Sequence, residues 1–181
     1  MKTLLLTFGM CLALCACKSP EARKPISKSS GSFISESVER NKAMFNAQKL
    51  RIEEMNAAQT DVEYIASKSG FWYYYNSKIE KDTIMPSFGD VVNFNYNVSD
   101  FSGNEIYSTS ELGTQNYIMD KEELFTGLRE GLKLMKPTET VTFLFPSQKA
   151  YGYYGDENKI GTNVPLICKV TVNTITQTQN D

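Results

Sequence analysis

The spacing of hydrophobic and polar residues changes near Gly70, and this change divides the chain into a helical part and a part made mainly of strands. From Phe33 to Ala58 the apolar residues recur at roughly heptad spacing with charges between them, which predicts a helix. The apolar stripe is thin, and Asn41 and Gln48 interrupt it. We therefore expect a helix that rests on its own domain or stands exposed, and that can be removed without unfolding the domain. The alternative is a dimerisation helix.

Beyond Gly70 the apolar residues alternate with polar ones, which is typical of half-buried strands. The predicted strands are 71–75, 91–98, 106–110, 117–119, 139–145 and 164–175. Only residues 120–135 keep a helical spacing, and Pro137 ends that helix. Thr60 and Glu63 form a capping-box pattern that predicts one short further turn. One helix among about five strands indicates an α+β domain, with an antiparallel sheet wrapped over a single helix.

The N-terminus carries a short apolar run, Leu4–Leu14, which is too short to span a membrane and is typical of a secretory signal. The run ends in "LCAC", which resembles the lipobox of bacterial lipoproteins, with Cys17 after the small Ala16 as the acylated residue. An ordinary cleaved signal is the alternative. The expected organisation is a signal over 1–16, a flexible tether over 17–32, a helical segment over 33–66 and a folded domain over 67–178. We therefore expect a bacterial envelope protein that faces the periplasm and binds the membrane through lipid, with the leaflet left open.

Composition narrows the function further. The chain has 19 Lys and Arg against 21 Asp and Glu, a formal net charge of −2, which argues against a nucleic-acid partner. It has no histidine, which excludes Ser-His and Cys-His nucleophiles and removes the commonest zinc ligand. Three tyrosines and three glycines are nevertheless crowded into residues 149–161, which is more than a simple connection between strands requires.

Three stretches, "GLREGLKLM", "TVTFLFPSQKAYG" and "NKIGTNVPLICKVTV", resemble the FK506-binding-protein family of peptidyl-prolyl isomerases. The upstream strands and turns agree, so that the resemblance covers about residues 69–175. Within that family the chain resembles the gliding-motility-associated isomerase lipoproteins, because it has a lipobox, a leading helix and the stretch "GFWYYYN". The resemblance implies proline-containing polypeptides as clients and an envelope protein complex as a further partner. It implies neither a cofactor nor a metal.

The resemblance also implies a site, an apolar basin between sheet and helix that receives a prolyl ring. The residues carried over by motif as catalytic are Tyr96, Tyr107 and Tyr151. Those carried over as substrate-binding are Ile106, Tyr117, Leu124, Phe125, Leu128, Ile160 and Cys168. The residues expected at the rim, on a flap beside Tyr151, are Tyr153, Tyr154 and Asp156. The alternative is that these tyrosines only fix the loop to the sheet.

The chain departs from the family pattern at three positions. Tyr107 stands where the family usually has an aspartate, Leu128 where it often has tryptophan, and Cys168 where it usually has an aromatic residue. These changes imply a shallower basin and weaker activity, and Tyr107→Asp is expected to raise kcat/KM. Two other functions stay open: a binding module of low activity, and a structural lipoprotein whose basin is filled by its own side chains.

Overall fold

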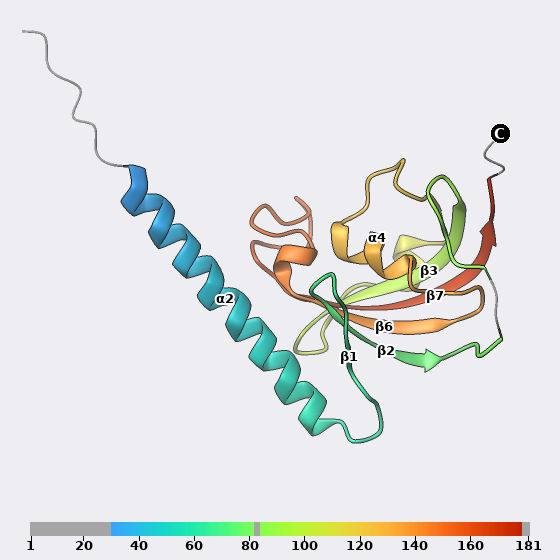
Figure 1. Ribbon diagram of the computed structural model, residues 1–181, viewed down its shortest axis with the longest axis horizontal. Helices are drawn as coiled ribbons and strands as arrows, with labels where there is room; N and C mark the ends of the chain where they lie inside the picture. The colour runs from blue at the N-terminus through green and yellow to red at the C-terminus, as the bar shows by residue number, and fades with distance from the viewer. Residues whose placement is uncertain (1–29, 82–83, 179–181) are drawn as a thin grey trace, which may run out of the picture. The chain divides into compact units, whose positions relative to one another are not determined.

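The structure, a computed structural model, describes residues 30–81 and 84–178 (Figure 1). Its helices are α2 (Ser30–Ala58), α3 (Thr109–Leu112), α4 (Thr126–Leu132) and the 3-10 turn η2 (Ser147–Lys149). Its strands are β1 (Ile65–Ala66), β2 (Trp72–Ser77), β3 (Val91–Asp100), β4 (Glu105–Tyr107), β5 (Gln115–Ile118), β6 (Thr140–Phe145) and β7 (Leu166–Thr176). The expected signal 1–16, the Cys17 anchor and the tether up to residue 29 lie outside the described residues. Within the described ranges, none of the helices combines the length and the apolar character that crossing a bilayer needs.

The strands form one antiparallel sheet in the order β1-β2-β6-β7-β3-β4, with β5 also paired to β3. The helix α4 lies over the face of β3, β7 and β6 (Figure 1). The α+β prediction, an antiparallel sheet over a short helix with a further helix at the N-terminal side, is therefore confirmed.

The alternating residues of β3 and β7 build the core beneath α4. Val98 lies opposite Cys168, Tyr96 opposite Val170 and Phe94 opposite Val172. Each of these side chains is buried, whereas the intervening positions of β3 are half exposed. The alternation read from the sequence thus places one face of the sheet against α4, as expected for a half-buried strand.

The glycines of "GLREG" explain how closely α4 approaches the sheet. A Cβ atom on Gly127 would lie 2.5 Å from Phe145 Cδ1 and 2.6 Å from the backbone oxygen of Lys149. A Cβ atom on Gly131 would lie 2.9 Å from Phe143 Cε1. Both glycines therefore provide room for the β6 rings.

The helix α4 is shorter than the helix that the apolar spacing predicted over residues 120–135. Asp120 has a left-handed backbone with φ 60°, and the Glu122 carboxylate accepts a 2.8 Å hydrogen bond from the backbone N–H of Ile118. Such local bonds compete with helix formation. Leu124 and Phe125 consequently precede α4, and the expected start at residue 120 is wrong.

Two smaller sequence-based expectations are also wrong. The strand expected over 106–110 ends at Tyr107, because the Ser108 hydroxyl accepts a hydrogen bond from the Glu111 N–H and begins α3. The capping box at Thr60 starts no helical turn, and the Thr60 hydroxyl bonds to the neighbouring Asp61 instead.

The part of α2 from Val38 onward belongs to the same compact unit as the sheet and α4. Ile52 is only 1% exposed, and the half-buried Gln48, one turn earlier on the same helix face, makes hydrogen bonds to Ser147 and Asn163. Gln48, which interrupts the apolar stripe, is therefore a docking residue. The domain boundaries expected at residues 33, 67 and 178 stay predictions. Because Ile52 and Gln48 contact the domain, we expect removal of the helix to lower the free energy of unfolding.

Candidate functional site

An open cleft of about 740 Å³ lies where the start of α4 meets the turn that follows β6. Its lining residues are Tyr96, Gln115, Glu122, Glu123, Leu124, Phe125, Thr126, Arg129, Ala150 and Tyr151. Half of these residues are aromatic or aliphatic and half are polar or charged, so the cleft combines an apolar wall with several polar groups. The cleft is not filled by its own side chains, which argues against the structural lipoprotein without a basin.

Four of the residues selected from the sequence line this cleft: Tyr96, Leu124, Phe125 and Tyr151. The Phe125 ring lies 5.1 Å from the Tyr151 ring and 5.4 Å from the Phe145 ring, so these aromatic rings support one another. The Tyr151 hydroxyl has no hydrogen-bond partner among the described residues. It can therefore donate to a bound substrate.

The other six selected residues belong to the core cluster around the cleft, but they do not line it. Leu128 and Cys168 are fully buried, and Tyr117 and Ile160 are nearly so. Ile106 and Tyr107 are half-buried against the same cluster. The structure thus brings all ten residues into one region, and their individual roles stay predictions.

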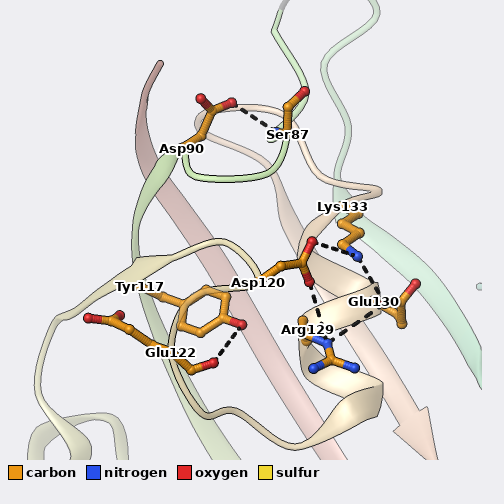
Figure 2. Close-up of polar contacts among 8 residues, drawn as sticks. All are labelled: Ser87, Asp90, Tyr117, Asp120, Glu122, Arg129, Glu130 and Lys133. Atoms are coloured by element: carbon orange, nitrogen blue, oxygen red, sulfur yellow. Dashed lines mark hydrogen bonds and ion pairs between the residues drawn. The ribbon is translucent and has the colours of Figure 1, made fainter. Parts of the chain in front are cut away.

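Tyr117 shows one such indirect role. Its hydroxyl donates a 3.2 Å hydrogen bond to the backbone carbonyl of Glu122 (Figure 2). This bond closes the turn that leads to Leu124 and Phe125. Tyr117 therefore supports the cleft wall from behind.

Tyr107 pairs with a residue that the sequence placed only at the rim. Its hydroxyl donates a short hydrogen bond to the Asp156 carboxylate, on the segment 152–163 that we call the flap. The flap residue Lys159 also donates its backbone N–H to the Tyr107 oxygen, at 3.3 Å, and forms an ion pair with Glu111 of α3. Tyr107 therefore joins the flap to β4.

Several polar residues of the cleft were missed in the sequence. Arg129 follows Leu128 on α4, and its guanidinium lies beside Asp120 and Glu130 (Figure 2). Gln115 precedes Tyr117 by two positions on β5, which places both on one face of the strand. The sequence signal that could have identified Arg129 and Gln115 is their position one or two residues away from Leu128 and Tyr117, which the motifs had selected.

Two phenols of the cleft, Tyr96 and Tyr151, stay protonated at neutral pH. Burial raises the pKa of Tyr151 to about 12, with a smaller contribution from the nearby Asp156 carboxylate. Burial likewise raises the pKa of Tyr96. Partial burial acts to raise the pKa of Asp156, but hydrogen bonds from Tyr107 and from the Ile160 N–H hold it below its usual value of 3.8. Both phenols therefore remain hydrogen-bond donors.

Residues 82–173, just over half of the chain, match the family model for FKBP-type peptidyl-prolyl cis-trans isomerases. The chain belongs to this FKBP-type family. The family resemblance read from the sequence is thereby confirmed, and so is the enzyme class. A search among curated proteins found no match to this FKBP-type isomerase.

Two solved structures share the fold of this FKBP-type isomerase. A peptidyl-prolyl cis-trans isomerase from Pseudomonas syringae pv. tomato is similar with a TM-score of 0.59 and 19% identity, over 75% of this chain and 96% of that one. FkpA from Escherichia coli is similar with a TM-score of 0.60 and 21% identity, over 97% of this chain and 81% of that one. At these identities the likeness shows the fold alone.

The chemistry of an FKBP-type isomerase suits a cleft without histidine. Amide resonance opposes rotation of the C–N bond by about 18–20 kcal/mol, and X-Pro bonds exchange unaided over roughly 10–100 s. In the rotated transition state the carbonyl loses resonance and needs less polar solvation. Apolar walls such as those of Leu124 and Phe125 would therefore favour the transition state, and the Tyr151 hydroxyl can orient the bound peptide by donating a hydrogen bond to one of its carbonyl oxygens. No proton transfer is needed.

We expect kcat/KM of this isomerase to be constant from pH 6 to pH 9. The phenol of Tyr151 ionises only far above this range, and Asp156 is already ionised throughout it. Because the pKa of Asp156 is lowered in the folded state, its stabilising contribution is complete above pH 3.8 and is lost as the pH falls through the lowered value. The measurement is kcat/KM on a proline peptide from pH 6 to pH 9, and a bell-shaped pH profile would point to proton transfer.

The structure reverses the expectation for Tyr107→Asp. The new carboxylate would face Asp156 instead of donating a hydrogen bond to it. We expect the free energy of unfolding to fall by about 1–2 kcal/mol and kcat/KM to fall with it. Tyr107→Phe is the matched control, because it loses the bond without adding a charge and should be less affected. A rise in kcat/KM for Tyr107→Asp would refute this arrangement.

Proposed function

We propose that this isomerase is held by lipid at the bacterial cell envelope, faces the periplasm and accelerates prolyl isomerisation in exported proteins as they fold. The observation that carries the catalytic part is the open cleft in which the Tyr151 hydroxyl, without a hydrogen-bond partner among the described residues, stands beside the apolar Leu124 and Phe125. The proposal for the envelope is supported by the apolar run Leu4–Leu14 and by Cys17 after Ala16.

The lipid anchor can be tested separately from catalysis. We expect the mature chain to begin at an acylated Cys17, because the short apolar run ends there. Mass spectrometry of membrane-extracted protein should detect a lipid-modified peptide that starts at Cys17. Cys17→Ser should move the protein out of the membrane fraction. A soluble wild-type product that begins elsewhere would contradict the anchor.

We further propose that the clients include proteins of an envelope complex connected with gliding motility. The support is the combined resemblance of the lipobox, the leading helix and "GFWYYYN" to the gliding-motility-associated isomerase lipoproteins. Deletion of the gene should then lower the amount of folded motility proteins in the envelope, and a catalytically weakened Tyr151→Phe protein should restore them only in part. Full restoration by that variant would indicate that binding alone suffices.

A binding module of low activity is the second candidate, and one observation favours it. Tyr153 and Tyr154 on the flap are 70% and 84% exposed and pack edge to face at 5.4 Å. Such exposed rings are suited to hold apolar segments of an unfolded client.

Refolding of a test protein whose slow phase is limited by prolyl isomerisation separates the two candidates. An isomerase accelerates that phase at substoichiometric amounts. A binding module leaves the rate unchanged, suppresses aggregation, and loses this effect in the double variant Tyr153→Ser and Tyr154→Ser.

A further inference from the structure

The carboxamide of Gln48 lies between the turn that precedes the active-site flap and the last residue of the flap. Its Nε2 donates to the Ser147 hydroxyl at 3.1 Å and to the Asn163 carbonyl at 3.2 Å. Its Oε1 accepts from the Ser147 backbone N–H at 2.9 Å. Ser147 lies in the turn that precedes the flap and Asn163 is the last residue of the flap, so one side chain from α2 bonds to the chain on both sides of the loop.

Ser147 in turn fixes the backbone on both sides of Tyr151. The Ser147 carbonyl accepts hydrogen bonds from the N–H groups of Ala150, at 3.1 Å, and Gly152, at 2.9 Å. The Gly152 carbonyl accepts a 2.7 Å hydrogen bond from the Asn163 N–H. Tyr151 therefore stands inside a closed chain of bonds whose outer members are held together by Gln48.

The burial of Ser147 makes this connection costly to lose. Ser147 is 0% exposed, and both its N–H and its hydroxyl pair with Gln48. A buried backbone N–H without a partner is strongly disfavoured. If the amide of Gln48 is removed, the turn must rearrange to satisfy Ser147, and Tyr151 moves with it.

We propose that Gln48 is a positioning residue for prolyl isomerisation, and that through it the part of α2 from Val38 onward belongs to the active site. Gln48 does not line the cleft; it acts through Ser147 and Asn163 on the orientation of Tyr151. The inference rests on the isomerase activity of the cleft. It explains why an amide interrupts the apolar stripe of α2, next to the buried Ile52.

Gln48→Met in the full chain tests the proposal, because methionine keeps the length of the side chain and removes its hydrogen bonds. We expect kcat to fall about 3–10-fold with KM little changed, since Leu124 and Phe125 still bind the prolyl ring. Amide hydrogen exchange at Gly152 and Asn163 should become at least about tenfold faster, with β3 and β7 unchanged. Leu50→Ala, on the same helix but 57% exposed, is the matched control and should behave as wild type.

Gln48→Glu keeps the acceptor for the Ser147 N–H but cannot donate to the Asn163 carbonyl. It should leave Ser147 protected from exchange, speed exchange at Asn163, and give a kcat between wild type and Gln48→Met. If Gln48→Met does not fold, Gln48→Glu tests the positioning role of Gln48 on its own. Wild-type kcat and wild-type exchange at Gly152 and Asn163 in these variants would overturn the proposal, even if the free energy of unfolding fell. Because hydrogen exchange needs no substrate, it tests the positioning independently of catalysis.

Discussion

Gly127→Ala is expected to lower the free energy of unfolding by about 2 kcal/mol. Alanine would favour the helix by about 1 kcal/mol. The new methyl group, however, would lie 2.5 Å from the Phe145 ring and 2.6 Å from the Lys149 carbonyl oxygen. Overpacking costs about 1–3 kcal/mol, and the upper part of that range applies here because a backbone atom must move. The steric cost therefore exceeds the gain in helix propensity.

Gly161→Ala is the matched control for this substitution. Gly161 has no positive φ, and a Cβ atom there would meet only Val164 Cγ2, at 4.0 Å. Urea unfolding should show a stability change within about 0.5 kcal/mol for this control. The displaced Lys149 lies two residues before Tyr151, so Gly127→Ala should also lower kcat/KM. Equal stability of Gly127→Ala and wild type would show that α4 is not held close to β6.

Tyr151→Phe is expected to lower kcat/KM about 5–30-fold. The substitution removes one hydroxyl and keeps the ring that packs against Phe125 at 5.1 Å. If that hydroxyl holds the substrate carbonyl in the transition state, its loss costs about 1–2 kcal/mol. Stability should change little, because the hydroxyl has no partner among the described residues.

Tyr153→Phe on the exposed part of the flap is the control for Tyr151→Phe. It makes the same chemical change outside the cleft and should leave kcat/KM near the wild-type value. A loss confined to KM would mean that the Tyr151 hydroxyl binds ground state and transition state equally. An unchanged kcat/KM would remove Tyr151 from the mechanism.

Local patterns in the sequence predicted the core of the fold. The alternation in β3 gave the buried face that includes Phe94 and Tyr96, and the "GLREG" spacing located the helix beneath which β6 packs. The start of α4 could not be read in this way. Apolar spacing alone does not reveal that the Glu122 carboxylate bonds to Ile118 and keeps the preceding segment out of the helix.

Contacts between distant segments were beyond the reach of sequence periodicity. Tyr107 and Asp156 are separated by 49 positions, and Gln48 and Ser147 by 99. A period identifies the buried face of each element, but the loops decide which polar side chains meet. Gln48 therefore looked like an interruption of a stripe, and Tyr107 like a missing carboxylate, until the structure supplied their partners.

The most direct test of the account is the rate of cis–trans exchange in an Ala-Leu-Pro-Phe peptide, measured by NMR exchange spectroscopy with catalytic amounts of the protein. The account predicts exchange well above the unaided rate, which corresponds to roughly 10–100 s. It also predicts that the proline signals of the peptide broaden selectively when the wild-type protein is added, and that the exchange rate is lower with Tyr151→Phe. Exchange that stays at the unaided rate with folded wild-type protein would contradict prolyl isomerisation in the Tyr151 cleft.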